Sequence, residues 1–202
     1  MKKGALIVVM LFLFISTHSC LDLLDKANRV ASELDSSPES TSESNYQTIA
    51  IDSVFKVDVP NYMKPLPNLN PEAVLQYGNI YKDAYLVVIQ ENKEEYINLF
   101  KELGEYNPEL PVIENYKNVQ KEMLKESINN ARISEYGLTN INNKPARQIK
   151  VFGEVEDVEA AYIIAFVEGK EDIFMLMNWT VKNKFQKHEN AFEYVNGTFK
   201  TE

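Results

Sequence analysis

The residue types that most often carry chemistry are scarce in this sequence, which has one cysteine and two histidines. Cys20 and His18 lie two positions apart in the stretch ISTHSC (15–20), and a cysteine beside a histidine can be an activated nucleophile. The stretch directly follows an apolar run, so the same cysteine is also a candidate processing site. The residues before Cys20 indicate whether the stretch is a reaction centre or a targeting signal.

The first nineteen residues have the organisation of an export signal. Lys2 and Lys3 form a positive segment, ALIVVMLFLFI (5–15) is an apolar segment, and small residues follow. This apolar run is too short for a transmembrane helix, which needs about 20 residues. We therefore expect residues 1–19 to be removed on export. Cleavage there removes His18, and with it the apparent Cys/His pair.

The residues around the expected cleavage site resemble the lipobox of bacterial lipoprotein precursors, which are cut just before a lipidated cysteine. Ser19 fits that pattern, whereas Thr17 and His18 replace the leucine and the small residue that the family prefers. An ordinary signal peptidase cutting after Ser19 is the alternative. A lone thiol in an exported chain has no disulfide partner. We therefore expect an acylated Cys20 that anchors the protein in a bacterial envelope membrane, on the periplasmic face or at the surface.

A spacer separates Cys20 from the part of the chain that can fold. Residues 35–44 are rich in Ser and Glu and poor in apolar residues, a composition that does not order by itself. We therefore divide the chain into a lipoprotein signal peptide (1–19), a lipidated linker (20–45) and one α+β domain (46–202).

The composition indicates a folded, acidic protein. Hydrophobic residues make up 45% of the chain, enough for a core, and the net charge is −9. A surface of this sign repels nucleic-acid phosphates, so we expect no nucleic-acid partner.

The hydrophobic periodicity changes along the chain in the order strands, helices, strands, helix. Three apolar stretches, AYLVVI, AAYIIAFV and IFMLMNW, must be covered on both faces. We therefore expect an α+β fold, with a mostly antiparallel central sheet flanked by helices on both faces. The predicted strands are two within 46–60 around a turn at Asp52 and Ser53, then 72–80, 84–92, 132–138, 145–155, 159–169 and 172–181; the predicted helices are 93–103, Asn107 to about Asn129, and 185–199.

Several stretches together resemble the PsbP-like domain, a fold shared by the extrinsic photosystem II protein, a Ran-binding import factor and many bacterial lipoproteins. They are SVFKVDVPNYM (53–63), NLNPEAVLQYGN (68–79), AYIIAFVEGKEDIFMLMNWTVKNKF (161–185) and HENAFEYVNGTF (188–199). The resemblance covers roughly residues 46–200. It implies an antiparallel sheet between helices and a non-enzymatic binding or scaffold role, with no catalytic residues to carry over.

Few residues of the domain are candidates for binding. Glu154, Glu156 and Asp157 surround a reversal and are candidate Ca²⁺ ligands, although their spacing matches no EF-hand loop and a solvated turn explains them as well. Ser53 follows Asp52 as in an O-glycosylation acceptor, and a hairpin turn is the alternative interpretation.

Four tyrosines form a second candidate set. They are either the lining of a ligand groove or half-buried aromatics on a sheet face, and they are Tyr62, Tyr77, Tyr81 and Tyr85. His188 lies on the apolar stripe of the last predicted helix, where we expect a packed side chain rather than a functional one.

These observations predict a lipid-anchored envelope protein that binds an unidentified protein or small ligand, without a cofactor and without catalysis. A small hydrolase with a carboxylate pair and a secreted module that binds glycans or a host are the alternatives.

Overall fold

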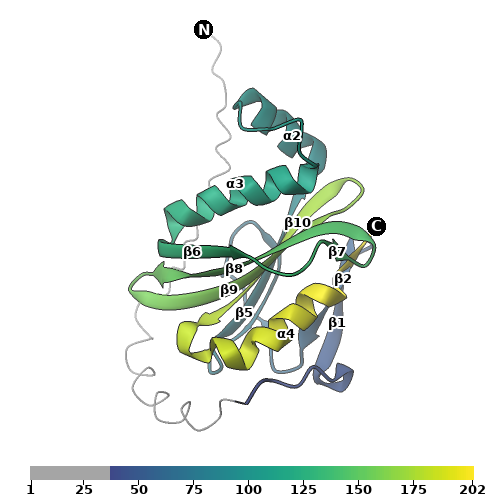
Figure 1. The fold of residues 1–202 in the computed structure, drawn as a ribbon. Helices are drawn as coiled ribbons and strands as arrows, with labels where there is room; N and C mark the ends of the chain where they lie inside the picture. The colour runs from purple at the N-terminus through teal and green to yellow at the C-terminus, as the bar shows by residue number, and fades with distance from the viewer. Residues whose placement is uncertain (1–36) are drawn as a thin grey trace.

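The computed structural model describes residues 37–202, which fold into a twisted sheet with helices on both faces (Figure 1). The signal peptide, Cys20 and the linker up to residue 36 lie outside the described residues. Within 37–202, no helix has the length and apolar character needed to cross a membrane.

The main sheet has the strand order β3-β4-β5-β10-β9-β8-β6, and its neighbouring strands pair antiparallel. A short strand, β7, adds to β8. The strands are β3 (Lys64–Pro65), β4 (Ala73–Asn79), β5 (Ala84–Asn92), β6 (Asn129–Glu135), β7 (Asn140–Ile141), β8 (Lys144–Val155), β9 (Val158–Glu168) and β10 (Asp172–Val181). A smaller sheet contains β1 (Tyr46–Ile51), β2 (Phe55–Pro60) and β11 (Lys200–Thr201), in the order β1-β2-β11.

Each face of the main sheet buries its own core because successive side chains of a strand point to opposite sides. On β10, Phe174 and Leu176 join a core beneath α4 (Phe185–Thr198) and the small sheet, and Met175 joins the opposite core. That opposite core lies beneath α2 (Lys93–Glu102) and α3 (Val112–Ser127). Figure 1 shows α3 and α4 on opposite sides of the sheet. The expected α+β architecture is confirmed.

A chain of buried amides fixes α4 on the sheet. Asn178 of β10 donates to the Oδ1 of Asn196 (2.8 Å), and Asn196 donates to the Oε1 of Gln148 (3.0 Å). The helix also inserts Phe192, whose full burial stabilises the fold by about 1.5–3 kcal/mol. Together these contacts hold the other residues of α4, including His188, in a defined place.

The start of α3 differs from the expectation. The helix begins at Val112, not at Asn107. Proline at position 111 disfavours helical backbone at Leu110. Asn107 instead forms a local turn, in which its side chain accepts from the N–H of Glu109 (2.9 Å).

The end of the spacer also differs from the expectation that residues 35–44 are unordered. Glu39 packs against the domain, and its N–H donates to the carbonyl of Lys187 in α4 (2.9 Å). Residues Glu43–Asn45 then form a short 3-10 turn that leads into β1.

Candidate functional site

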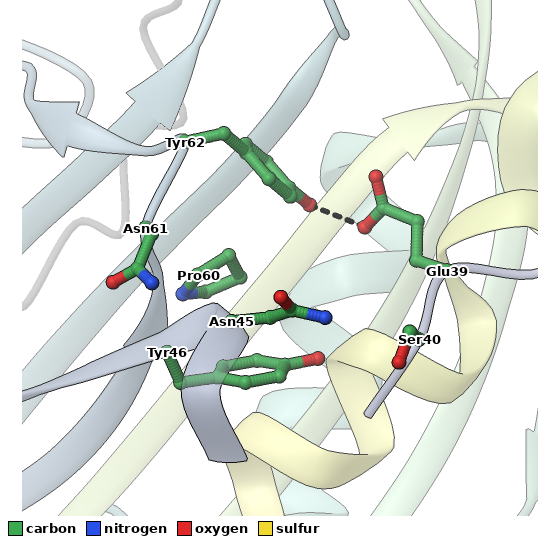
Figure 2. Close-up of a pocket in the computed structure, with 7 residues that line it drawn as sticks. All are labelled: Glu39, Ser40, Asn45, Tyr46, Pro60, Asn61 and Tyr62. Atoms are coloured by element: carbon green, nitrogen blue, oxygen red, sulfur yellow. Dashed lines mark hydrogen bonds between the residues drawn. The ribbon is translucent and has the colours of Figure 1, made fainter. Parts of the chain in front are cut away.

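The described residues bring together a partly buried carboxylate, a tyrosine, a lysine and a histidine from four separate parts of the chain. Glu39 comes from the spacer, Tyr62 follows β2, Lys82 lies in the β4–β5 turn, and His188 belongs to α4. We call these four residues the Glu39 site. In Figure 2 the hydroxyl of Tyr62 points directly at the Glu39 carboxylate.

Both carboxylate oxygens of Glu39 have partners. The Tyr62 hydroxyl donates to Oε2 (2.6 Å), and the Lys82 ammonium donates to Oε1 (3.3 Å). The same ammonium lies 4.7 Å from the centre of the Tyr62 ring, a cation–π distance. The Glu39 side chain is 12% exposed, so these contacts replace most of the water that would otherwise solvate the charge.

His188 is completely buried and has oxygen atoms on both sides of its ring. Its Nε2 lies 3.2 Å from the carbonyl oxygen of Lys82, and its Nδ1 lies 3.2 Å from the Oε2 of Glu39. The second contact is electrostatic rather than a formed hydrogen bond, because Nδ1 does not meet the geometry of one. The expectation of a packed histidine is therefore met, and the side chain is also part of a polar site.

The site shifts the pKa values of its members. Burial acts to raise the pKa of Glu39, but His188, Tyr62 and Lys82 outweigh it and lower that pKa. Burial and the neighbouring Glu39 charge raise the pKa of Tyr62 far above its usual value. The site therefore holds an ionised carboxylate and a neutral tyrosine.

An open pocket of about 270 Å³ lies beside the Glu39 carboxylate (Figure 2). Its walls combine aromatic, proline and amide side chains with Glu39, and they are Glu39, Ser40, Asn45, Tyr46, Pro60, Asn61 and Tyr62. The Tyr46 ring packs on Tyr194 of α4, with 4.3 Å between the ring centres. Burial, followed by the charge of Glu39, raises the pKa of Tyr46 to about 12.

The four tyrosines predicted as a groove do not share one. Tyr62 and Tyr77 pack on the α4 side of the sheet, whereas Tyr85 packs on the α3 side and stacks on Trp179 (5.2 Å). Tyr81 is 70% exposed at the tip of the β4–β5 turn. Alternation of side chains between the two faces of the sheet separates Tyr77 from Tyr85. Of the four tyrosines, only Tyr62 reaches the pocket.

The predicted acidic turn is a tight hairpin between β8 and β9. Glu156 and Asp157 occupy its two central positions with positive φ values of 48° and 66°, which suit a type I′ turn. Lys182 forms an ion pair with Glu159, the cross-strand neighbour of Glu154. Residues 37–202 contain no group of three or more His, Cys, Asp or Glu side chains arranged to hold a metal ion.

Ser53 is exposed in the turn between β1 and β2, beside Asp52 with its positive φ of 43°. The hairpin thus accounts for this pair of residues. Glycosylation of Ser53 stays a prediction.

Sequence reasoning missed Glu39 because it lies in a Ser/Glu-rich segment that has no periodicity. The available signal was indirect. A histidine on an apolar helix stripe needs a polar partner when buried, and His188 therefore implied an acceptor elsewhere in the chain.

No protein-family model matches the chain, and no curated protein matches it. Among solved structures, the chain is similar to the cyanobacterial PsbP (CyanoP) of Synechocystis, with 9% identity and a TM-score of 0.48 over 82% of this chain and 98% of that one. It is similar to LpqN of Mycobacterium tuberculosis, described as involved in cell envelope biogenesis, with 10% identity and a TM-score of 0.44 over 78% and 91% of the two chains. A Pseudomonas aeruginosa protein of unknown function has 14% identity and a TM-score of 0.46, over 76% and 95%. These likenesses concern the arrangement of helices and strands, as in the expected PsbP-like fold, and they assign no function and no lipid anchor.

Proposed function

We propose that this chain is an exported, lipid-anchored protein of a bacterial cell envelope, and that its domain binds a partner rather than catalysing a reaction. The anchor rests on the sequence before Cys20. The binding role rests on one observation in the domain: its single histidine, His188, is wholly buried between a carboxylate and a backbone carbonyl. A histidine held in this way is not free to act as a general base on a substrate.

The position of Glu39 supports a display role for the spacer. Nineteen peptide steps separate Cys20 from Glu39 (39 − 20), which limits the distance between the lipid and the domain to about 65 Å when fully extended. Because Glu39 contacts α4, the spacer joins the domain on its α4 side.

Substitution of Cys20 tests the anchor. Cys20→Ala is expected to move the protein from the membrane fraction to the soluble fraction of lysed cells, and from the detergent phase to the aqueous phase on partitioning. Ser19→Ala is the matched control, because it keeps a small residue at the cleavage site and is expected to stay in the membrane fraction. Unchanged partitioning of Cys20→Ala would refute lipidation.

A direct assay tests the absence of catalysis. The purified protein is incubated with isolated envelope glycan, and the release of reducing ends is measured against a heat-denatured sample. We expect no release. Release that Glu39→Gln abolishes would instead favour the hydrolase alternative.

A further inference from the structure

We propose that Tyr62, Lys82 and His188 form a binding site for an acidic side chain on an extended peptide, and that Glu39 of the protein's own spacer occupies this site in the structure. The inference specifies the kind of partner within the proposed binding role. It does not depend on the lipid anchor.

The three groups that surround the carboxylate are held in place by the domain itself. His188 stacks on Phe192 (5.7 Å between ring centres, 18° between planes) and contacts the Lys82 carbonyl through Nε2. The carbonyl of Tyr62 accepts from the side chain of Asn79 (2.9 Å), and the Lys82 ammonium lies over the Tyr62 ring. None of these contacts involves the spacer. The site is therefore preorganised, and departure of Glu39 would leave its donors aimed at a common point.

The three groups together select a carboxylate. The Tyr62 hydroxyl and the Lys82 ammonium donate to one place, beside the His188 ring. Charge-assisted hydrogen bonds of this kind are about twice as strong as neutral ones. Vacating the site would leave the Tyr62 hydroxyl without its acceptor and the Lys82 ammonium without its counter-charge, which costs free energy. The empty site therefore favours any carboxylate that reaches it.

Between residues 37 and 42, the spacer is held mainly through one residue. Ser37, Pro38 and Ser40 on either side of Glu39 are exposed, so only the glutamate side chain enters the domain. The N–H of Glu39 also donates to the carbonyl of Lys187, a main-chain contact that any extended peptide can make. Such an arrangement can be displaced by a partner that supplies the same two contacts.

The neighbouring pocket gives room for a second side chain of such a peptide. The pocket is open to solvent, has a volume of about 270 Å³ and is lined by Tyr46, Pro60 and Asn61. These properties suit the side chain of a residue next to the acidic one in the peptide. A partner that fills this pocket gains contact area that the small Ser40 side chain does not use. The ligand class is therefore an acidic peptide segment with a larger neighbour next to its Glu or Asp.

The test vacates the site and then offers a peptide to it. Glu39→Ala is made in the full chain, purified in detergent, and titrated with a capped peptide of residues 36–42, SSPESTS, by calorimetry and thermal shift. We expect binding and a rise in melting temperature for Glu39→Ala, and at least tenfold weaker binding for the wild type, whose site is occupied. The same peptide with glutamine at position 39 is expected to bind at least tenfold more weakly, as is the acidic peptide to Glu39→Ala combined with Tyr62→Phe.

Acetate separates the carboxylate from the peptide backbone as the recognised group. A rise in melting temperature of Glu39→Ala with sodium acetate but not with sodium chloride supports the carboxylate site, and a larger rise with the peptide at equal concentration supports the peptide class. Equal binding of the acidic and glutamine peptides, or no binding of either, would overturn the proposal whether or not the protein is lipidated.

If Glu39→Ala does not fold, hydrogen exchange of the wild type and Glu39→Gln gives the same decision. The amide of Glu39 is expected to be protected in the wild type and to exchange at least tenfold faster in Glu39→Gln. Equal protection would show that the carboxylate does not hold the spacer, and it would contradict the proposal.

Discussion

Two shielded carboxylates, one on each side of the main sheet, are treated in opposite ways by their surroundings. Glu39 on the α4 side has a tyrosine, a lysine and a histidine around it, and its pKa is lowered despite burial. Glu91 at the end of β5 faces the α3 side, where burial raises its pKa; the Tyr116 hydroxyl donates to it and partly opposes that rise. The nearby charge of Glu72 raises the pKa of Glu91 further. Burial alone therefore does not decide the ionisation of a carboxylate; the number and charge of its donors do.

The difference suggests different roles for the two residues. Glu39 is an ionised group bound by donors from several elements, as a ligand would be. Glu91 joins β5 to α3 through one tyrosine, as a structural contact does. Substitutions on the two sides can test this contrast.

The largest effect is expected for His188→Ala, which opens a cavity beside Phe192 and removes one of the side chains that shield Glu39 from water. We expect a loss of about 3 kcal/mol in the free energy of unfolding, measured by urea denaturation. The control on the same helix is Glu189→Ala, which removes a partly exposed ion pair with Lys150 and is expected to cost less than about 1 kcal/mol. Equal losses in the two variants would show that His188 has no special place in the core.

The next effect is expected on the other side of the sheet. Tyr116→Phe removes the hydroxyl that donates to Glu91, and we expect a loss of about 1–3 kcal/mol near neutral pH. Tyr96→Phe is the matched control, because the buried Tyr96 hydroxyl has no hydrogen-bond partner among residues 37–202 and its removal is expected to be neutral or slightly stabilising. Equal stability of the two variants would show that the Tyr116–Glu91 contact is unimportant.

The two carboxylates are expected to give opposite dependences of stability on pH. The lowered pKa of Glu39 contributes stability that is present above its unfolded value of about 4.3 and is lost as the pH falls through the folded value. The raised pKa of Glu91 contributes stability that is present below about 4.3 and is lost as the pH rises through its folded value. The groups that face Glu39 are Tyr62, Lys82 and His188.

Unfolding measured between about pH 3 and pH 7 separates the two contributions. Relative to the wild type, Glu39→Gln is expected to lose stability as the pH rises, and Glu91→Gln to gain it, each by on the order of 1 kcal/mol. Parallel pH profiles for the two variants would contradict the contrast between the sites.

The smallest effect is expected outside both regions. Tyr81→Ala removes a side chain that is 70% exposed, and we expect a change within about 0.5 kcal/mol. Tyr85→Ala breaks the stack on Trp179 and is expected to cost several times more. Thermal unfolding of both variants gives the two changes in melting temperature. A negligible change for Tyr81→Ala would show that this exposed side chain does not stabilise the fold.

Much of the fold was predictable from local patterns. Apolar runs such as 84–92 and 172–181 coincide with β5 and β10, because strands buried on both faces leave a continuous apolar signal. The helix α2 also begins where predicted, with Asn92 accepting from the N–H of Glu95 as its cap. The predicted start of α3, at Asn107, was wrong. A second proline after Pro108, Pro111, disfavours helical backbone at Leu110.

Little of the candidate site was predictable. Of the four predicted tyrosines, only Tyr62 belongs to the Glu39 site. Its contact there depends on Glu39, which is 23 positions away in the chain. Of the other predicted tyrosines, Tyr77 and Tyr85 lie on opposite faces of the sheet and Tyr81 lies in a turn. Glu156 and Asp157 occupy the centre of a tight turn, and the number of acidic residues in a segment does not predict the backbone conformation of such a turn.

Local sequence patterns predict the export signal and the succession of strands and helices, because these are properties of short segments. No local pattern predicts that an acidic residue of the spacer lies against a histidine of the last helix, 149 positions later (188 − 39). The physical reason is that burial of His188 creates a need for a polar partner, while the packing of α4, β2 and the β4–β5 turn determines where that partner must be.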